Sequence, residues 1–164
     1  MTNEQLLDYL PPCGLVCYTC PGFKDGAIKA YSENLLKLNE GYREFLDEKL
    51  SDEYRHILGE YDSFIRKLKR DSAPSCEGCR KNNGNNPSCI KECFIPECTQ
   101  GHGVDFCGEC NEFPCTKIAE SSIYGKEAKA GFYEGSLSIK KHGAAKYFDM
   151  KKNVSHYIGY IKME

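Results

Sequence analysis

The sequence predicts a small, mainly α-helical single domain, residues 1–164, with an irregular cysteine-rich region that bound metal stabilises. Two observations lead to this prediction. Long segments carry apolar residues at helical spacing, and eleven cysteines occur among 164 residues, all of them within two groups at 13–22 and 76–115. The second group has few large apolar residues in its first half, so metal rather than an apolar core is expected to hold it.

Residues 27–70 are predicted to form a helical hairpin inserted between the two cysteine groups. Apolar residues at spacings of three and four make one stripe before Leu50 and a second stripe after it. Ser51, followed by two acidic residues, is the candidate N-cap of the second helix. The two helices are therefore expected to join near Leu50 and to fold back on each other.

The two remaining segments differ in character. Residues 71–115 are rich in Gly, Pro, Asn and Cys, so little regular structure is expected there, and 81–88 is predicted to be a loop. Residues 116–164 return to helical character, and their aromatic side chains are expected to pack as core. Five glycines are expected to break this last segment into short helices: Gly125, Gly131, Gly135, Gly143 and Gly159.

The cysteine spacing indicates zinc. In a C-x-x-C pair the backbone turns so that both sulfurs can face one ion at about 2.3 Å. The pairs Cys76–Cys79 and Cys107–Cys110 have this spacing, and together with neighbouring cysteines they supply eight thiolates, enough for two tetrahedral zinc ions. Contiguous sites, such as Cys76, Cys79, Cys89 and Cys93, and interleaved sites use the same residues equally well, so the pairing stays open.

The N-terminal group, Cys13-x3-Cys17-x2-Cys20, offers three sulfurs and leaves a fourth position for a distant ligand, water or substrate. The same spacing holds an iron–sulfur cluster in radical enzymes, although this chain is too short for their barrel. Two or three zinc ions are expected, with an iron–sulfur cluster as the alternative. The fourth-ligand candidates are His102, His142, His156 and a cysteine borrowed from the middle group. The predicted metal ligands are Cys13, Cys17, Cys20, Cys76, Cys79, Cys89, Cys93, Cys98, Cys107, Cys110 and Cys115.

Several classes of protein are disfavoured. The start of the chain lacks a signal-peptide pattern and the cysteine number is odd, which argues against a disulfide framework. No segment has the ~18 apolar residues of a membrane span. The formal net charge is −2, and a zinc ion with four thiolates adds about −2 more, which disfavours nucleic-acid binding. A cytoplasmic location is expected.

The strings PCGLVCYTCPGF, CEGC and CFIPECTQGHGVDFCGECNEFPC resemble the cysteine-rich prokaryotic family known as domain of unknown function 3795. The resemblance covers about residues 12–118 and includes ten of the cysteines; Cys89 has no assigned position in it, and His102 stands where the family usually has Lys. It implies a metal-binding fold, without an established activity.

A metal-stabilised module that binds an unknown protein partner is the favoured function, because no complete acid/base constellation occurs. One alternative is an enzyme that uses an open three-cysteine zinc, with Glu109, Glu112 or His156 as the catalytic partner. The others are an iron–sulfur or redox protein and a reversible metal carrier.

Overall fold

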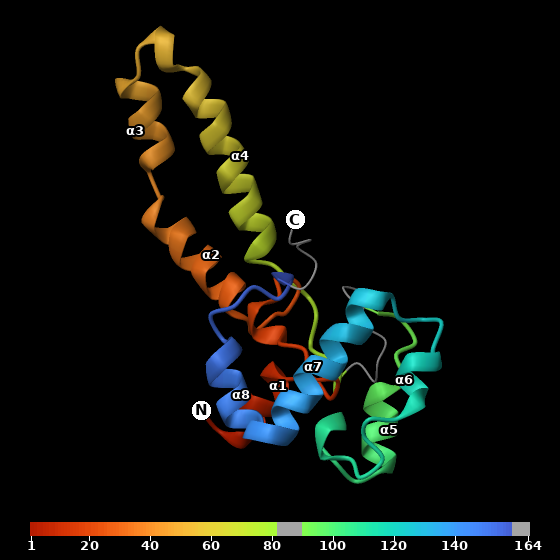
Figure 1. Cartoon of the computed structure of the whole chain (residues 1–164). Coiled ribbons are helices and arrows are strands. Elements are labelled where there is room, and N and C mark those ends of the chain that lie inside the picture. The colour runs from red at the N-terminus through yellow and green to blue at the C-terminus, as the bar shows by residue number, and fades with distance from the viewer. Residues whose placement is uncertain (82–89, 159–164) are drawn as a thin grey trace.

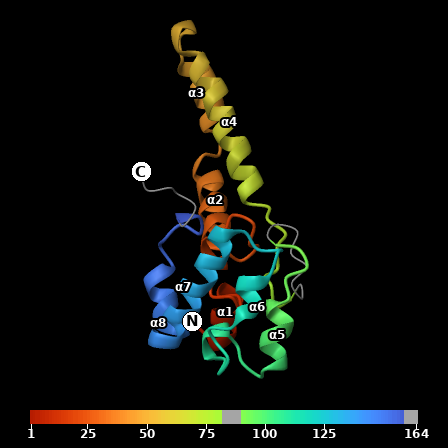
Figure 2. The same ribbon diagram turned by 45° about the vertical axis from the view of Figure 1, so that its right-hand side comes forward.

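The computed structural model describes residues 1–81 and 90–158. Cys89 and most of the predicted loop at 81–88 therefore lie outside the described residues, as does Gly159. A body of short helices and a long hairpin that projects from it make up the described chain (Figures 1 and 2). The prediction of a mainly helical single domain is confirmed. No helix within the described ranges is long and apolar enough to cross a membrane.

The hairpin consists of α2 (Ala27–Leu38), α3 (Tyr42–Lys49) and α4 (His56–Asp71). Its first arm is divided, because Gly41 adopts a φ of +76° between α2 and α3, a left-handed conformation that interrupts a helix. The N-cap predicted at Ser51 is wrong. Ser51 precedes a 3₁₀ turn, η2 (Asp52–Tyr54), and α4 begins only after that turn.

Polar contacts hold the two arms together across the hairpin. The Arg43 guanidinium on α3 contacts the Asp62 carboxylate on α4 at 3.0 Å. The Tyr61 hydroxyl donates to the carbonyl of Asn39 at 3.1 Å. Leu58 and Leu68 of α4 are buried, and they lie on the face of the helix that turns inward.

The body packs α1 (Asn3–Tyr9) against α7 (Lys126–His142) and α8 (Ala144–Lys151). The Thr2 hydroxyl accepts from the backbone N–H of Gln5, and the Gln5 side chain accepts from Thr2 in return, which fixes the start of α1. One apolar cluster joins the three helices: Leu6, Leu10, Val16, Phe106, Ile139, Tyr147 and Phe148.

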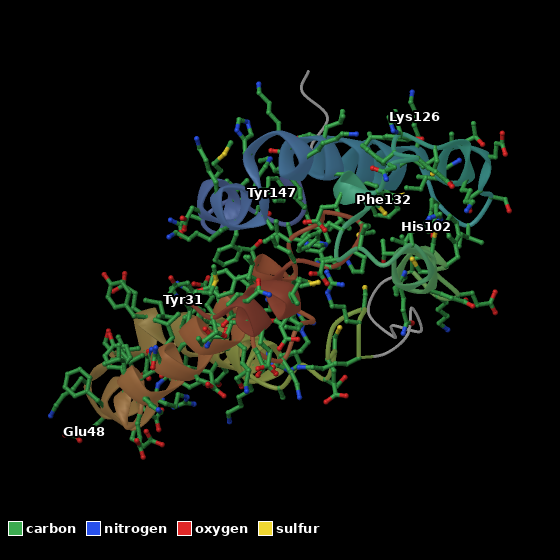
Figure 3. All side chains as sticks on the ribbon, turned by 90° about the horizontal axis from the view of Figure 1, so that it is seen from below. Tyr31, Glu48, His102, Lys126, Phe132 and Tyr147 are labelled. Atoms are coloured by element: carbon green, nitrogen blue, oxygen red, sulfur yellow. The ribbon has the colours of Figure 1, made fainter. Side chains whose placement is uncertain are left out.

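The body also contains four shorter elements: η1 (Cys17–Thr19), α5 (Ile95–Gly101), η3 (Cys107–Glu109) and α6 (Thr116–Glu120). A second apolar cluster joins this region to α7 and includes Ile95, Ile118, Tyr124 and Phe132. Figure 3 places Phe132 and Tyr147 on the body, whereas Tyr31 and Glu48 mark the hairpin. The expected burial of the C-terminal aromatic residues is confirmed for Tyr124, Phe132, Tyr147 and Phe148.

The expectation that Gly131 and Gly135 break the C-terminal helices is wrong, because α7 continues through both. The reason is close packing: a Cβ at Gly135 would stand 2.1 Å from the carbonyl oxygen of Gly14. A glycine in a helix costs about 1 kcal/mol relative to alanine, and here it lets another backbone approach. Gly125 and Gly143 do flank helices, as expected.

Candidate metal centre

The base of the hairpin brings together two segments that the hairpin separates in sequence. The backbone N–H of Cys76 donates to the carbonyl of Gly22 at 3.1 Å, and the N–H of Lys24 donates to the carbonyl of Cys76 at 2.9 Å. The side chains of Cys17, Phe23 and Cys76 pack together beside this bridge. The turn from Cys17 therefore lies against the segment that contains Cys76.

Hydrogen bonds from α7 and α8 hold the backbone at Cys13 and Gly14 in place. The Ser136 hydroxyl donates to the carbonyl of Cys13 at 3.3 Å, and the buried Tyr147 hydroxyl donates to the carbonyl of Gly14 at 2.8 Å. Gly14 has a φ of +79° and meets the backbone of Gly135, so its conformation and its closeness both require glycine. The Cys13 side chain is buried in consequence.

Six cysteines line one cavity of ≈ 310 Å³ between these segments and the start of α7. We call them the six-cysteine group: Cys13, Cys17, Cys20, Cys76, Cys79 and Cys93. None of the ten cysteines in the described part of the chain forms a disulfide bond. The N-terminal trio thus shares one cavity with three of the seven described middle cysteines, Cys76, Cys79 and Cys93. These three also belong to the contiguous site that the spacing allowed, whose fourth member, Cys89, lies outside the described residues.

Burial raises the pKa of the Cys13 thiol well above its usual range, and the charges of Cys79, Cys17 and Cys93 raise it further. A backbone N–H of Leu15 opposes this by donating to the sulfur. Thiols packed this closely cannot all ionise without a compensating positive charge. A bound cation would supply that charge.

Four further cysteines face a second, much smaller cavity of ≈ 20 Å³. The four-cysteine group is Cys98 on α5, Cys107 at the start of η3, Cys110 directly after η3, and Cys115 just before α6. Burial raises the pKa of the Cys107 thiol to about 12, and the other three thiols of this group add to that rise. The backbone N–H of Cys107 donates to the carbonyl of Pro12 at 2.9 Å, so this group is anchored to the N-terminal segment.

Cys93 belongs to the six-cysteine group and also affects the four-cysteine group. Its charge affects the pKa of Cys13 on one side and of Cys107 on the other. Its sulfur is 3.2 Å from the hydroxyl of Tyr124, which is buried. Burial and this contact raise the pKa of Tyr124, so the hydroxyl keeps its proton and can donate to a thiolate at Cys93.

Arg80, directly after Cys79, is a residue that the sequence reasoning missed. Its guanidinium donates to the carbonyls of Leu7 at 3.1 Å and Asp105 at 2.7 Å, and it lies over the ring of Phe106, 5.1 Å from the centroid. Burial lowers its pKa, whereas the nearby charges of Asp105, Cys13 and Cys79 raise it. A partly buried cation thus lies beside Cys79 of the six-cysteine group.

Two of the three candidate histidines line the cysteine cavities. The Nδ1 of His156 is 2.7 Å from the carbonyl of Val16, so this nitrogen is the donor, and the ring lines the six-cysteine cavity. His102 lines the smaller cavity, with its Nε2 3.9 Å from Glu112. His142 lines neither of these cavities in the described chain.

The two acidic residues considered as catalytic partners, Glu109 and Glu112, do not line the cavity that contains Cys13. The Glu109 carboxylate accepts from the backbone N–H groups of Asp105 and Phe106, both at 3.1 Å, and so holds the start of η3. Glu112 lines the smaller cavity. Within residues 1–81 and 90–158, no group of three or more His, Cys, Asp or Glu side chains has the geometry of a metal site. The predicted metal ligands remain predictions.

The comparisons with known proteins give one match. The profile of the family described as "Protein of unknown function (DUF3795)" matches residues 9–120, which is more than half of the chain and contains both cysteine groups. No match is found among curated proteins, and none among solved structures.

Proposed function

The chain belongs to the DUF3795 family of proteins of unknown function, and from its own side chains we propose that it is a zinc-binding protein whose metal-stabilised body carries an interaction hairpin. One observation supports the proposed zinc binding: the ten described cysteines divide into six around one cavity and four around another. Thiols scattered by chance would not gather in this way.

The four-cysteine group suits a single zinc ion. Four thiolates form a closed tetrahedral shell at about 2.3 Å from zinc, with no position left for substrate. The cavity of ≈ 20 Å³ is close to the 10–15 Å³ that one water molecule requires. Lys117 lines the cavity, and its charge opposes the rise in the pKa of Cys98, so it also favours a negatively charged zinc–thiolate site.

Metal analysis tests this part of the proposal. We expect purified protein to contain zinc, and the double variant Cys98→Ser/Cys115→Ser to contain one zinc fewer per chain. His102→Ala serves as the matched control, because it alters the same cavity without removing a thiolate, and it should keep its zinc. Folded wild-type protein that contains no metal, with its thiols reduced, would contradict the proposal.

The hairpin supports the interaction part. It projects from the body (Figure 1), and large apolar side chains on it face solvent. Tyr31, Leu35 and Leu38 recur at spacings of four and three, so they form one stripe on α2, and Leu38 is 82% exposed. The rings of Tyr42 and Phe45 continue the exposed apolar surface on α3 with their centroids 6.0 Å apart. Such a surface indicates a protein contact.

The charges of the hairpin point to a second copy of this chain as the partner. The outer end, residues 40–53, contains six acidic and two basic side chains. The end of α4 nearest the body, residues 66–71, contains four basic side chains and one acidic one, Asp71, which pairs with Lys67. Two hairpins packed antiparallel would place the acidic end of each against the basic end of the other, with the apolar stripes between them.

Sedimentation of the full chain tests this pairing. We expect a dimer that weakens as the salt concentration rises, because exposed charge pairs are screened. Leu38→Asp should give a monomer, whereas the control Leu137→Asp, which changes an exposed leucine on α7 instead, should leave the dimer intact. A wild-type chain that stays monomeric at high concentration and low salt would refute the second copy as partner.

A further inference from the structure

A third cavity, of ≈ 360 Å³, lies between α7 and the turn that follows α8, and we call it the α7 cavity. One wall is a single face of α7, on which Glu127, Gly131 and Glu134 recur at spacings of four and three. The opposite wall comes from residues 151–158. Pockets for small organic ligands measure about 300–1,000 Å³, so the α7 cavity has the size of such a site.

Fixed contacts join the walls of the α7 cavity. The Lys151 ammonium contacts the Glu134 carboxylate at 3.1 Å, and this ion pair links the end of α8 to α7. The Nδ1 of His156 donates to the carbonyl of Val16 at 2.7 Å, which fastens the C-terminal turn to the N-terminal segment. The cavity is therefore formed before a ligand arrives, and binding there does not require the walls to be ordered first.

The lining of the α7 cavity combines apolar walls with two unpaired charges at one end. Figure 3 shows Lys126 towards one end of α7 and Tyr147, another lining residue, towards the other. Lys126 and Glu127 are exposed neighbours, and neither makes an ion pair or a hydrogen bond within the part of the chain that the structure describes. The apolar lining residues are Leu15, Val16, Ala128, Ala130, Val154 and Ile158.

We propose that the α7 cavity binds a free amino acid with a large apolar side chain. The ligand's carboxylate contacts the Lys126 ammonium, its own ammonium contacts the Glu127 carboxylate, and its side chain lies against the apolar walls. This inference is independent of the proposed zinc binding and of the proposed pairing of hairpins.

The class of ligand follows from the charges. An amino acid holds its ammonium and its carboxylate on one carbon atom, and the two unpaired charges of the cavity likewise lie together, on long side chains at neighbouring positions. A ligand with one charge would leave either Lys126 or Glu127 without a partner. The remaining charged pair, Lys151 with Glu134, is already satisfied. Pockets of this kind are mostly apolar, with a few polar groups that fix the orientation of the ligand.

Calorimetric titration of the full chain tests the ligand class. We expect L-phenylalanine and L-leucine to bind with saturation at one molecule per chain. L-phenylalaninamide lacks the carboxylate and N-acetyl-L-phenylalanine lacks the ammonium, so each should bind about tenfold more weakly than L-phenylalanine, because each loses one charged contact. If neither amino acid binds at millimolar concentration, or if the three phenylalanine compounds bind equally well, the proposal is wrong.

Variants test the two charged contacts one at a time. Lys126→Gln should weaken the binding of L-phenylalanine about tenfold and leave the binding of L-phenylalaninamide unchanged, because the amide has no carboxylate to lose. Glu127→Gln should do the same with N-acetyl-L-phenylalanine as the unaffected compound. Both side chains are exposed, so both variants should keep the thermal stability of the wild type.

Two further variants complete the test. Lys141→Gln is the matched control, because Lys141 is an exposed lysine of the same helix that does not line the α7 cavity, and it should bind like the wild type. Ala130→Phe places a ring at the cavity and should abolish binding of all three compounds. Wild-type affinity for L-phenylalanine in both Lys126→Gln and Glu127→Gln would overturn the inference.

Discussion

Replacing Cys107 by serine is expected to destabilise the chain strongly at neutral pH, even when zinc is present. A structural zinc site contributes on the order of 10 kcal/mol of apparent binding free energy, which becomes folding free energy. The whole stability of a domain is typically about 5–15 kcal/mol. Cys107 sits where the four-cysteine group meets the N-terminal segment, since its N–H donates to Pro12. Loss of one thiolate there therefore removes a contribution as large as the net stability.

Urea titrations with zinc and with a chelator separate the metal from the packing. In the chelator, the wild type and Cys107→Ser should unfold alike, because neither holds zinc at that site. In zinc, only the wild type should become more resistant to urea. If both proteins unfold at the same urea concentration in zinc, Cys107 is not a ligand. If the variant is weaker by the same amount in both conditions, its effect comes from packing.

The helical hairpin shows which structural features can be predicted from local sequence spacing. The apolar stripes on either side of Leu50 predict its two arms, because a helix of 3.6 residues per turn needs only local spacing. The break at Gly41 and the late start of α4 depend on backbone conformation at single residues, and propensity describes that poorly. The existence of the elements could therefore be predicted, while their ends could not.

The sequence allows a middle cysteine as the fourth ligand of the N-terminal trio. Which cysteines lie together could not be predicted, because that depends on contacts between distant segments. Spacing identifies C-x-x-C pairs, but only the bridge between Phe23 and Cys76 shows that the N-terminal trio faces the middle cysteines. Arg80 and Tyr124 give no sequence signal for the same reason. Their roles come from carbonyls of α1, from Asp105 and from Cys93, none of which is a near neighbour in sequence.

Gly135→Ala and Gly59→Ala are expected to change stability in opposite directions, although each replaces a helical glycine by alanine. At Gly59, in α4, no described atom lies within 4 Å of a built Cβ, so alanine should stabilise the fold by up to about 1 kcal/mol. At Gly135 the same methyl group would lie 2.1 Å from the carbonyl oxygen of Gly14, a backbone atom. Overpacking of this kind costs about 1–3 kcal/mol or more.

The clash that Gly135→Ala creates is also expected to move part of the six-cysteine group. The carbonyl of Gly14 accepts a hydrogen bond from the Tyr147 hydroxyl, and Cys13 directly precedes Gly14. A methyl group that pushes this turn off α7 would move Cys13 with it, so Gly135→Ala should lose metal from the six-cysteine group before it loses zinc from the other. Thermal unfolding together with metal content measures both effects. If Gly135→Ala is as stable as Gly59→Ala and retains all its metal, the contact between Gly14 and α7 does not position Cys13.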